Sequence, residues 1–226
     1  MKAVIMAGGE GTRLRPLTCC VPKPMVPILN RPMMEHILKL LKRHGFREIA
    51  CTLWYLPGDV TAYFQDGSAW GLSLEYFIER EPLGTAGSVK NAAQALKSTF
   101  VVMSGDALTD IDLSAAAAFH RAKGSLATLV LTRVANPLSY GVVLTAEDGR
   151  IKQFLEKPTW SQVFSDTVNT GIYILEPEVL ELVEPGRKVD FSQDVFPELL
   201  RRGAPLFGYI AEGYWSDVGS LEIYRK

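Results

Sequence analysis

The sequence has no long apolar run and contains little cysteine. No segment of the 226 residues approaches the length of a membrane span, and Met1-Lys2 leads directly into a short strand-like run. We therefore expect neither a membrane partner nor a signal peptide. The cysteines, Cys19, Cys20 and Cys51, are odd in number and lack the spacing of a metal site. This pattern indicates reduced thiols in a cytoplasmic protein.

A large net charge of either sign is also absent. The formal net charge is −1, which argues against general binding of nucleic acid. The charges are unevenly distributed, because residues 1–43 contain eight cations and two anions, a net charge of +6, and the remainder carries −7. A basic amino-terminal segment in a nearly neutral protein favours a small polyanionic ligand over a nucleic-acid surface.

The order of predicted elements is typical of an α/β fold. The first half alternates strands with helices, which favours a parallel sheet, and the second half has closely spaced strands that favour antiparallel pairs. We expect one domain over residues 1–226, with a mixed, mostly parallel central sheet and helices on both faces. The predicted strands are 2–6, 47–53, 72–78, 99–104, 126–132, 141–145, 150–156, 170–175 and 205–210. The predicted helices are 32–44, 58–66, 85–97, 112–123, 177–184 and 195–202.

A glycine-rich loop follows the first predicted strand. Closely spaced glycines over residues 8–11 let backbone N–H groups surround an anion, and Arg13, Arg15 and Lys23 supply positive charge. The loop is not a Walker loop, because it has no Gly-Lys-Ser or Gly-Lys-Thr sequence. It is not a dinucleotide fingerprint, because Leu14 stands where the last glycine is required. The sequence therefore predicts polyphosphate binding at a loop of another kind.

Several short motifs follow one another in a specific order along the chain. They are Gly8-Gly9-x-Gly11-Thr12-Arg13-Leu14-x-Pro16, Pro22-Lys23-Pro24, Leu83-Gly84-Thr85-Ala86-Gly87-Ser88, Ser104-Gly105-Asp106, Phe154-Leu155-Glu156-Lys157-Pro158, Asn169-Thr170-Gly171 and Trp215-Ser216-Asp217-Val218-Gly219. Together they closely resemble the sugar-1-phosphate nucleotidyltransferases, the nucleotide-sugar pyrophosphorylases. The resemblance implies a Rossmann-like nucleotidyltransferase domain. It also implies an enzyme that joins a nucleoside triphosphate to a sugar 1-phosphate and releases pyrophosphate.

The resemblance also implies a role for each motif residue. Arg13 and Lys23 are the expected catalytic residues, because their charges would neutralise the β- and γ-phosphates and the α-phosphate respectively. Mg²⁺ is the expected cofactor, held by Asp106 and Asp217. The expected nucleotide-binding residues are Ala7, Gly8, Gly9, Gly11, Thr12, Gly84 and Asp106. The expected sugar-phosphate-binding residues are Gly141, Glu156, Lys157, Asn169 and Thr170.

The local sequence qualifies some of these roles and gives other charged and aromatic residues a structural role instead. Glu156 and Lys157 are neighbours, so both reach one pocket only if the strand ends or bulges there. Either Asp110 or Asp112 would cap the alanine-rich helix that follows. The histidines and tryptophans look like packing, surface or rim residues; they are His36, His44, His120, Trp54, Trp70, Trp160 and Trp215. The meeting of Asp217 with Asp106 follows from the resemblance alone.

The exact substrates are left open by the sequence. The motifs most resemble the branch that makes GDP-mannose, so we expect GTP and mannose 1-phosphate. Thymidylyl transfer to glucose 1-phosphate is the nearest alternative, and adenylyl, cytidylyl and heptose-phosphate variants stay open. The intact charged residues disfavour a regulatory protein that only binds nucleotide sugar, and Leu14 disfavours an NAD-binding oxidoreductase. Family members often associate and often carry a carboxyl-terminal domain, so a homo-oligomer and such a domain are alternatives here.

Overall fold

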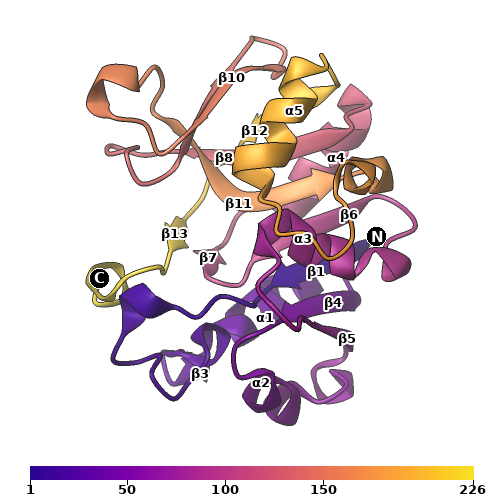
Figure 1. Ribbon diagram of the computed structural model, residues 1–226, viewed down its shortest axis with the longest axis vertical. Helices are drawn as coiled ribbons and strands as arrows, with labels where there is room; N and C mark the ends of the chain where they lie inside the picture. Colours follow the sequence, from indigo (N-terminus) through magenta and orange to yellow (C-terminus); the bar gives the residue numbers. More distant parts are fainter.

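A nine-stranded mixed sheet forms the centre of the computed structural model, which describes residues 1–226 (Figure 1). The strand order is β10-β9-β11-β6-β1-β4-β5, with β8 joining β11 to β12. The strands of this sheet are β1 (Lys2–Met6), β4 (Glu48–Leu53), β5 (Ser73–Ile78), β6 (Phe100–Ser104), β8 (Ala127–Arg133), β9 (Gly141–Thr145), β10 (Ile151–Glu156), β11 (Thr167–Leu175) and β12 (Leu206–Ile210).

The sheet has a parallel part and an antiparallel part. Strands β6, β1, β4 and β5 are parallel neighbours, as the alternation in the first half of the sequence predicts. In the second half, β11 runs antiparallel to β6, β8 and β9, and β9 pairs with β10 as a hairpin. Strand β12 returns parallel to β8. The predicted α/β fold with a mixed central sheet is therefore confirmed.

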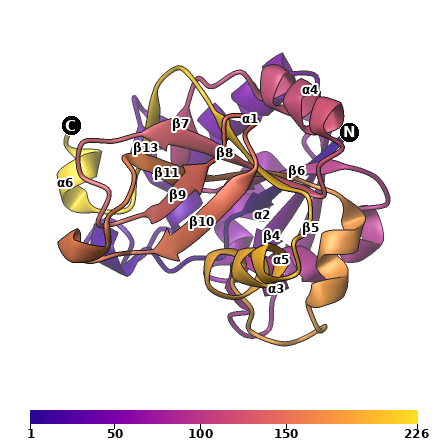
Figure 2. The same ribbon diagram turned by 90° about the horizontal axis from the view of Figure 1, so that it is seen from above.

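Helices cover both faces of the sheet, as predicted. Side chains alternate across β1, so Ile5 joins one core and Val4 joins the other. The first core receives α1 (Met33–Arg43), α2 (Pro57–Phe64) and α4 (Leu113–Lys123), and the second receives α3 (Gly84–Asn91) and α5 (Phe196–Arg201). Figure 2 shows α1 and α4 on one side of the sheet and α3 and α5 on the other. A short helix, α6 (Leu221–Tyr224), lies near the carboxyl end.

Three predicted helices differ from the observed ones. The helix predicted over 85–97 ends at Asn91, and a 3₁₀ turn (Ala93–Ala95) follows it. The helix predicted over 177–184 is a 3₁₀ helix (Pro177–Leu182), the form that short helical segments often take. The helix predicted over 195–202 begins as a π-helical turn (Phe191–Val195) that continues into α5. None of the helices combines the length and the hydropathy needed to span a bilayer.

Two short strand pairs were not predicted. Strands β2 (Pro27–Ile28) and β3 (Arg31–Pro32) form a hairpin, and β7 (Ala107–Thr109) pairs with β13 (Trp215–Asp217). Strands of two or three residues carry too little periodicity to be detected in a sequence. The pair β7–β13 nevertheless connects the middle of the chain with its carboxyl end, directly beside Asp106.

The polar residues near α4 have structural roles. The Asp112 carboxylate caps α4 by accepting the N–H groups of Ser114 and Ala115, at 2.8 and 3.0 Å. Asp110 instead accepts the N–H of Tyr214 at 2.6 Å, so it joins the β7–β13 region rather than the helix. His120 is buried beside Thr128, with Nδ1 and Oγ1 2.8 Å apart, in agreement with its expected packing role.

We expect Asp112→Ala to lower the free energy of unfolding by about 1 kcal/mol, because two N–H groups at the start of α4 lose their acceptor. Urea unfolding of the two proteins measures the difference. Asp59→Ala is the matched control, since Asp59 lies in the first turn of α2 without a side-chain cap there. Equal losses in both variants would show that the effect comes from charge near a helix start and not from capping.

Candidate active site

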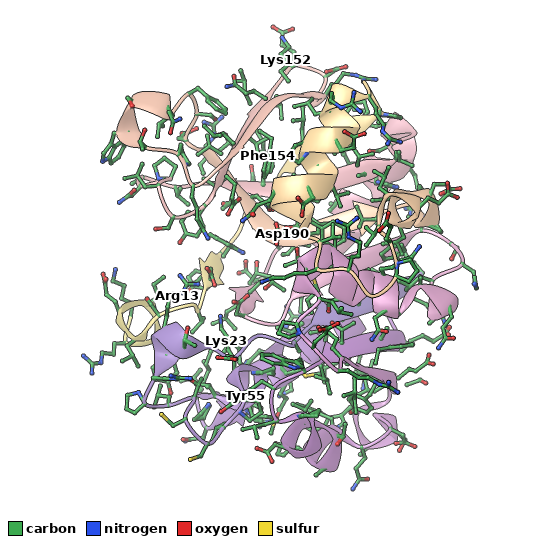
Figure 3. All side chains as sticks on the ribbon, in the orientation of Figure 1. Arg13, Lys23, Tyr55, Lys152, Phe154 and Asp190 are labelled. Atoms are coloured by element: carbon green, nitrogen blue, oxygen red, sulfur yellow. The ribbon has the colours of Figure 1, made fainter.

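A cavity of about 460 Å³ lies at the carboxyl ends of the parallel strands. This edge is where α/β sheets commonly bind ligands. The residues after β1, β4, β5 and β6 all contribute to its wall. The sequence-predicted residues that line it are Ala7, Gly8, Gly9, Gly11, Thr12, Arg13, Lys23, Gly84 and Asp106. Figure 3 shows Arg13 and Lys23 on the amino-terminal segment and Asp190 on a late segment, and all three line this cavity.

The glycine loop is folded tightly against the segment that follows it. Gly11 has a φ of +65°, and its carbonyl accepts the hydroxyl of Thr18 at 2.7 Å. A Cβ at Gly11 would lie 2.9 Å from the Thr18 methyl group and 3.2 Å from Lys23 Cβ. A glycine is therefore needed at this position, both for its backbone conformation and for the close approach of Lys23.

Asp106 is placed by the close approach of β6 to the end of β1. The N–H of Gly105 donates to the Met6 carbonyl at 2.8 Å, and a Cβ there would lie 2.8 Å from the same oxygen. The next residue, Asp106, receives the Lys23 ammonium on Oδ2 and the Ser104 hydroxyl on Oδ1. Burial disfavours the charged form of Asp106, but these donors stabilise it, so its pKa lies below the usual value.

Asp217 meets Asp106 through the short β7–β13 pair. In the register of this pair, Asp217 lies opposite Ala107, and the N–H of Val218 donates to the Asp106 carbonyl at 3.0 Å. Asp217 Oδ1 is buried and no protein donor reaches it. Burial and the nearby Asp106 carboxylate raise the pKa of Asp217 to about 6.

The two aspartates fit the magnesium ion that the resemblance implies. They are hard oxygen ligands, and the unpartnered buried oxygen of Asp217 lacks the positive partner that such an atom requires. Nowhere in the structure are three or more His, Cys, Asp or Glu side chains arranged so that they could hold a metal ion by themselves. A site with only two carboxylates suits Mg²⁺, which usually keeps waters and takes its remaining ligands from bound phosphates.

Arg13 completes this arrangement from the glycine loop. A Cβ at Gly219 would lie 3.0 Å from Arg13 Nη2 and 3.0 Å from Asp217 Oδ1, so both groups approach the same glycine. Gly219 itself lines the cavity. Positive and negative groups from the start, the middle and the end of the chain therefore converge there.

The second glycine motif is joined to a late segment of the chain. Gly84 has a φ of +72°, and the N–H groups of Ala86 and Gly87 both donate to the Val189 carbonyl, at 3.0 and 3.1 Å. The Thr85 hydroxyl donates to Asp190 Oδ2 at 2.8 Å. Asp190 lines the cavity and was not expected there, because no motif in the sequence pointed to it.

The expected sugar-phosphate residues lie outside the cavity lining. Strand β10 ends at Glu156, and Lys157 has a φ of +47°, which confirms the expected end of the strand. A Cβ at Gly141 would lie 2.7 Å from Glu156 Oε2, so these two residues are adjacent. Burial raises the pKa of Glu156, Asp190 adds to the rise, and Lys157 opposes it. Lys157 is largely exposed, with 64% of its side chain accessible.

The side chains of Asn169 and Thr170 form hydrogen bonds with other groups of the protein. Asn169 Nδ2 donates to the hydroxyls of Tyr173 and Ser192, at 3.0 and 3.2 Å, and its Oδ1 accepts the Gly171 N–H. The Thr170 hydroxyl is buried and donates to the Val130 carbonyl at 2.7 Å. The binding of sugar phosphate by these two residues and by Gly141, Glu156 and Lys157 stays a prediction.

Glu79 is a cavity residue that sequence reasoning missed. It follows β5 directly, where a charged residue looks like an ordinary surface position. In the structure it is 8% exposed and lines the cavity. Its Oε2 accepts the Leu83 N–H at 3.0 Å, but no protein donor reaches the buried Oε1, which faces Gly8. An acceptor without a partner is therefore available to a ligand.

The sequence matches the family described as "Nucleotidyl transferase" over residues 2–226. The chain belongs to this family. Among its relatives, the mannose-1-phosphate guanylyltransferase of Mycobacterium tuberculosis is 40% identical, over 99% of this chain and 62% of the relative. The UTP–glucose-1-phosphate uridylyltransferase of Synechocystis is 41% identical, over 99% of this chain and 61% of the relative. The chain thus spans about three fifths of the length of these curated relatives.

Solved structures agree with the family assignment. A Bacillus anthracis protein assigned as a glucose-1-phosphate thymidylyltransferase, solved with sucrose, has a TM-score of 0.90 and 25% identity. That match covers 100% of this chain and 92% of the other. HddC from Yersinia pseudotuberculosis, complexed with GMP-PN, has a TM-score of 0.82 and 27% identity over 99% of this chain and 96% of the other. This nucleotidyl transferase therefore shares its fold both with a protein assigned as a thymidylyltransferase and with a protein solved with GMP-PN.

Gly84→Ala is expected to weaken binding of a nucleoside triphosphate by about tenfold or more, because the new Cβ would lie 2.6 Å from the Val189 carbonyl oxygen and displace the cavity wall. Titration calorimetry measures the affinity. Gly203→Ala is the matched control, since Gly203 has a similar φ of +66° but no atom within 4 Å of its Cβ position. Loss of affinity in both variants, or in neither, would contradict the assignment of Gly84 to the binding site.

Proposed function

We propose that this nucleotidyl transferase moves a nucleotidyl group from a nucleoside triphosphate to a sugar 1-phosphate and releases pyrophosphate. The observation that carries the proposal is the convergence of Arg13, Lys23 and Asp106 at one cavity. Asp217 lies behind its lining, next to Asp106 through the β7–β13 pair and close to the lining residue Gly219. A triphosphate and a metal ion together match this set of two cations and two carboxylates. The family match over residues 2–226 supports the same reaction class.

The proposed reaction is a displacement at the α-phosphorus. An oxygen of the sugar phosphate forms a new P–O bond there, and the bond to the oxygen that bridges to the β-phosphate breaks, so that pyrophosphate leaves with the electron pair. Both reactants are anions, so catalysis consists of positioning and charge neutralisation, and no covalent nucleophile is needed. Lys23 would neutralise the α-phosphate, and Arg13 would hold the departing pyrophosphate. Mg²⁺ held by Asp106 and Asp217 would supply further neutralisation of phosphate oxygens.

Glu79 supports guanine as the preferred base. A carboxylate only accepts hydrogen bonds, and the Watson–Crick edge of guanine offers two neighbouring donors, N1–H and the N2 amino group. Uracil and thymine instead offer one N–H between two carbonyl oxygens, which a carboxylate would repel. The unpartnered Oε1 of Glu79 in the cavity wall therefore favours GTP over UTP and dTTP.

Mannose 1-phosphate is the proposed acceptor, in keeping with the name of the Mycobacterium relative. Glucose 1-phosphate is the alternative, which the names of the Synechocystis and Bacillus proteins favour. In either case Glu156 would accept hydrogen bonds from sugar hydroxyls and Lys157 would neutralise the sugar phosphate. The proximity of Gly141 to Glu156 makes these residues one candidate subsite.

A panel of nucleoside triphosphates against sugar 1-phosphates tests the reaction and its substrates. With Mg²⁺ present, we expect release of pyrophosphate, fastest with GTP and mannose 1-phosphate, and no release after removal of the metal with EDTA. Asp217→Asn is expected to reduce the rate by about a hundredfold or more, because one carboxylate of the metal pair is lost. Full activity without divalent metal, or no activity with any pair of substrates, would contradict the proposal.

Glu79→Gln tests the base preference separately from the chemistry. The amide offers one donor and one acceptor, so it suits the edge of uracil better than a carboxylate does. We expect the ratio of kcat/KM for GTP to that for UTP to fall by about tenfold or more. Glu10→Gln is the matched control, because Glu10 also lines the cavity but lies on the glycine loop. An unchanged ratio in Glu79→Gln, or the same change in both variants, would refute the role of Glu79.

A further inference from the structure

The Lys23 ammonium is bound to the Asp106 carboxylate, which the metal ion would need as a ligand. Its ammonium contacts Asp106 Oδ2, and the Ser104 hydroxyl occupies Oδ1, so both oxygens of Asp106 already have donors. The side chains of Lys23 and Asp106 are only 11% and 20% exposed, so this ion pair is largely shielded from water. Asp217 Oδ1, in contrast, has no donor. Of the two candidate metal ligands, Asp106 is therefore engaged by other donors, and Asp217 is free to bind a metal ion. In this sense the metal site is closed at Asp106.

A lysine ammonium and a divalent cation cannot share one partly buried carboxylate oxygen. Their like charges would stand a few ångströms apart, where water screens repulsion poorly. A metal ion that enters between Asp106 and Asp217 must therefore displace Lys23. Without another anion to receive the ammonium, this displacement leaves a charge in a partly buried position, which weakens metal binding.

Lys23 is placed so that its ammonium could contact a phosphate of a bound triphosphate in place of Asp106. Lys23 is the first residue of a short 3₁₀ turn (Lys23–Met25), and it stands between Pro22 and Pro24, so its backbone is restrained. Its stem lies beside Gly11, and its side chain lines the same cavity as the glycine loop. A flexible four-carbon stem can therefore move its ammonium from Asp106 toward a phosphate without movement of the backbone.

We propose that Lys23 acts as an internal counter-ion that closes the metal site until a triphosphate arrives. The bound triphosphate draws the ammonium off Asp106, and the freed carboxylate then joins Asp217 in binding the metal. Nucleotide and metal thus strengthen each other's binding, as linkage requires of two coupled ligands. This inference rests on the proposed function, because it uses the triphosphate and the metal of that reaction.

Titration of nucleotide-free protein with Mn²⁺, with free metal measured by electron paramagnetic resonance, tests the inference. We expect Lys23→Met to bind Mn²⁺ about tenfold more tightly than the unmodified protein, because Asp106 loses its counter-ion. Arg15→Met is the matched control, since Arg15 belongs to the same loop but pairs only with Glu10, at 3.9 Å. Its affinity should stay within about twofold. Affinity in Lys23→Met equal to or below that of the unmodified protein would overturn the proposal.

Ser104→Ala provides a second test that keeps Lys23 in place. It frees Asp106 Oδ1 but leaves the ammonium, so Mn²⁺ affinity should remain as weak as in the unmodified protein. A tenfold gain in this variant would show that the hydroxyl, and not Lys23, closes the site. If the unmodified protein turns over its substrates but Lys23→Met binds Mn²⁺ no more tightly than the unmodified protein does, only this inference is refuted. Tight Mn²⁺ binding by Lys23→Met without turnover by the unmodified protein would refute only the proposed function.

Discussion

Two neighbouring, partly buried aspartates, Asp106 and Asp217, concentrate negative charge that the rest of the site must balance. Asp106 and Asp217 come from opposite halves of the sequence, and the β7–β13 pair holds them together. Burial and the neighbouring Asp106 carboxylate raise the pKa of Asp217, whereas Lys23 lowers the pKa of Asp106 against the opposing effect of burial. The structure keeps this arrangement because positive groups are supplied from the glycine loop and from the segment after it.

The fold delivers these groups through a few close backbone approaches. Gly105 lies against the end of β1, Gly84 lies against Val189, and Gly11 lies against Thr18 and Lys23. Each contact leaves no room for a Cβ, and each places a neighbouring functional residue at the cavity. The parallel strands provide a common edge, and glycines in the segments that follow these strands allow distant parts of the chain to meet there.

Local patterns in the sequence predicted most of the large elements and the residues of the glycine loop. The helix predicted over 32–44 appears as α1, and the expected end of the strand at Glu156 is seen in the backbone of Lys157. The meeting of Asp217 with Asp106 followed only from family resemblance, because it depends on three-residue strands without detectable periodicity. Glu79 and Asp190 gave no signal, since their burial arises from long-range packing that no local pattern encodes.

The most direct test is a crystal structure of the protein with Mn²⁺ and a non-hydrolysable GTP analogue, using anomalous scattering to locate the metal. The account predicts one manganese peak bound by both Asp106 and Asp217, with the Lys23 ammonium on a phosphate oxygen and the guanine edge on Glu79. A manganese peak remote from this pair, or Lys23 still on Asp106 beside a bound triphosphate, would contradict it.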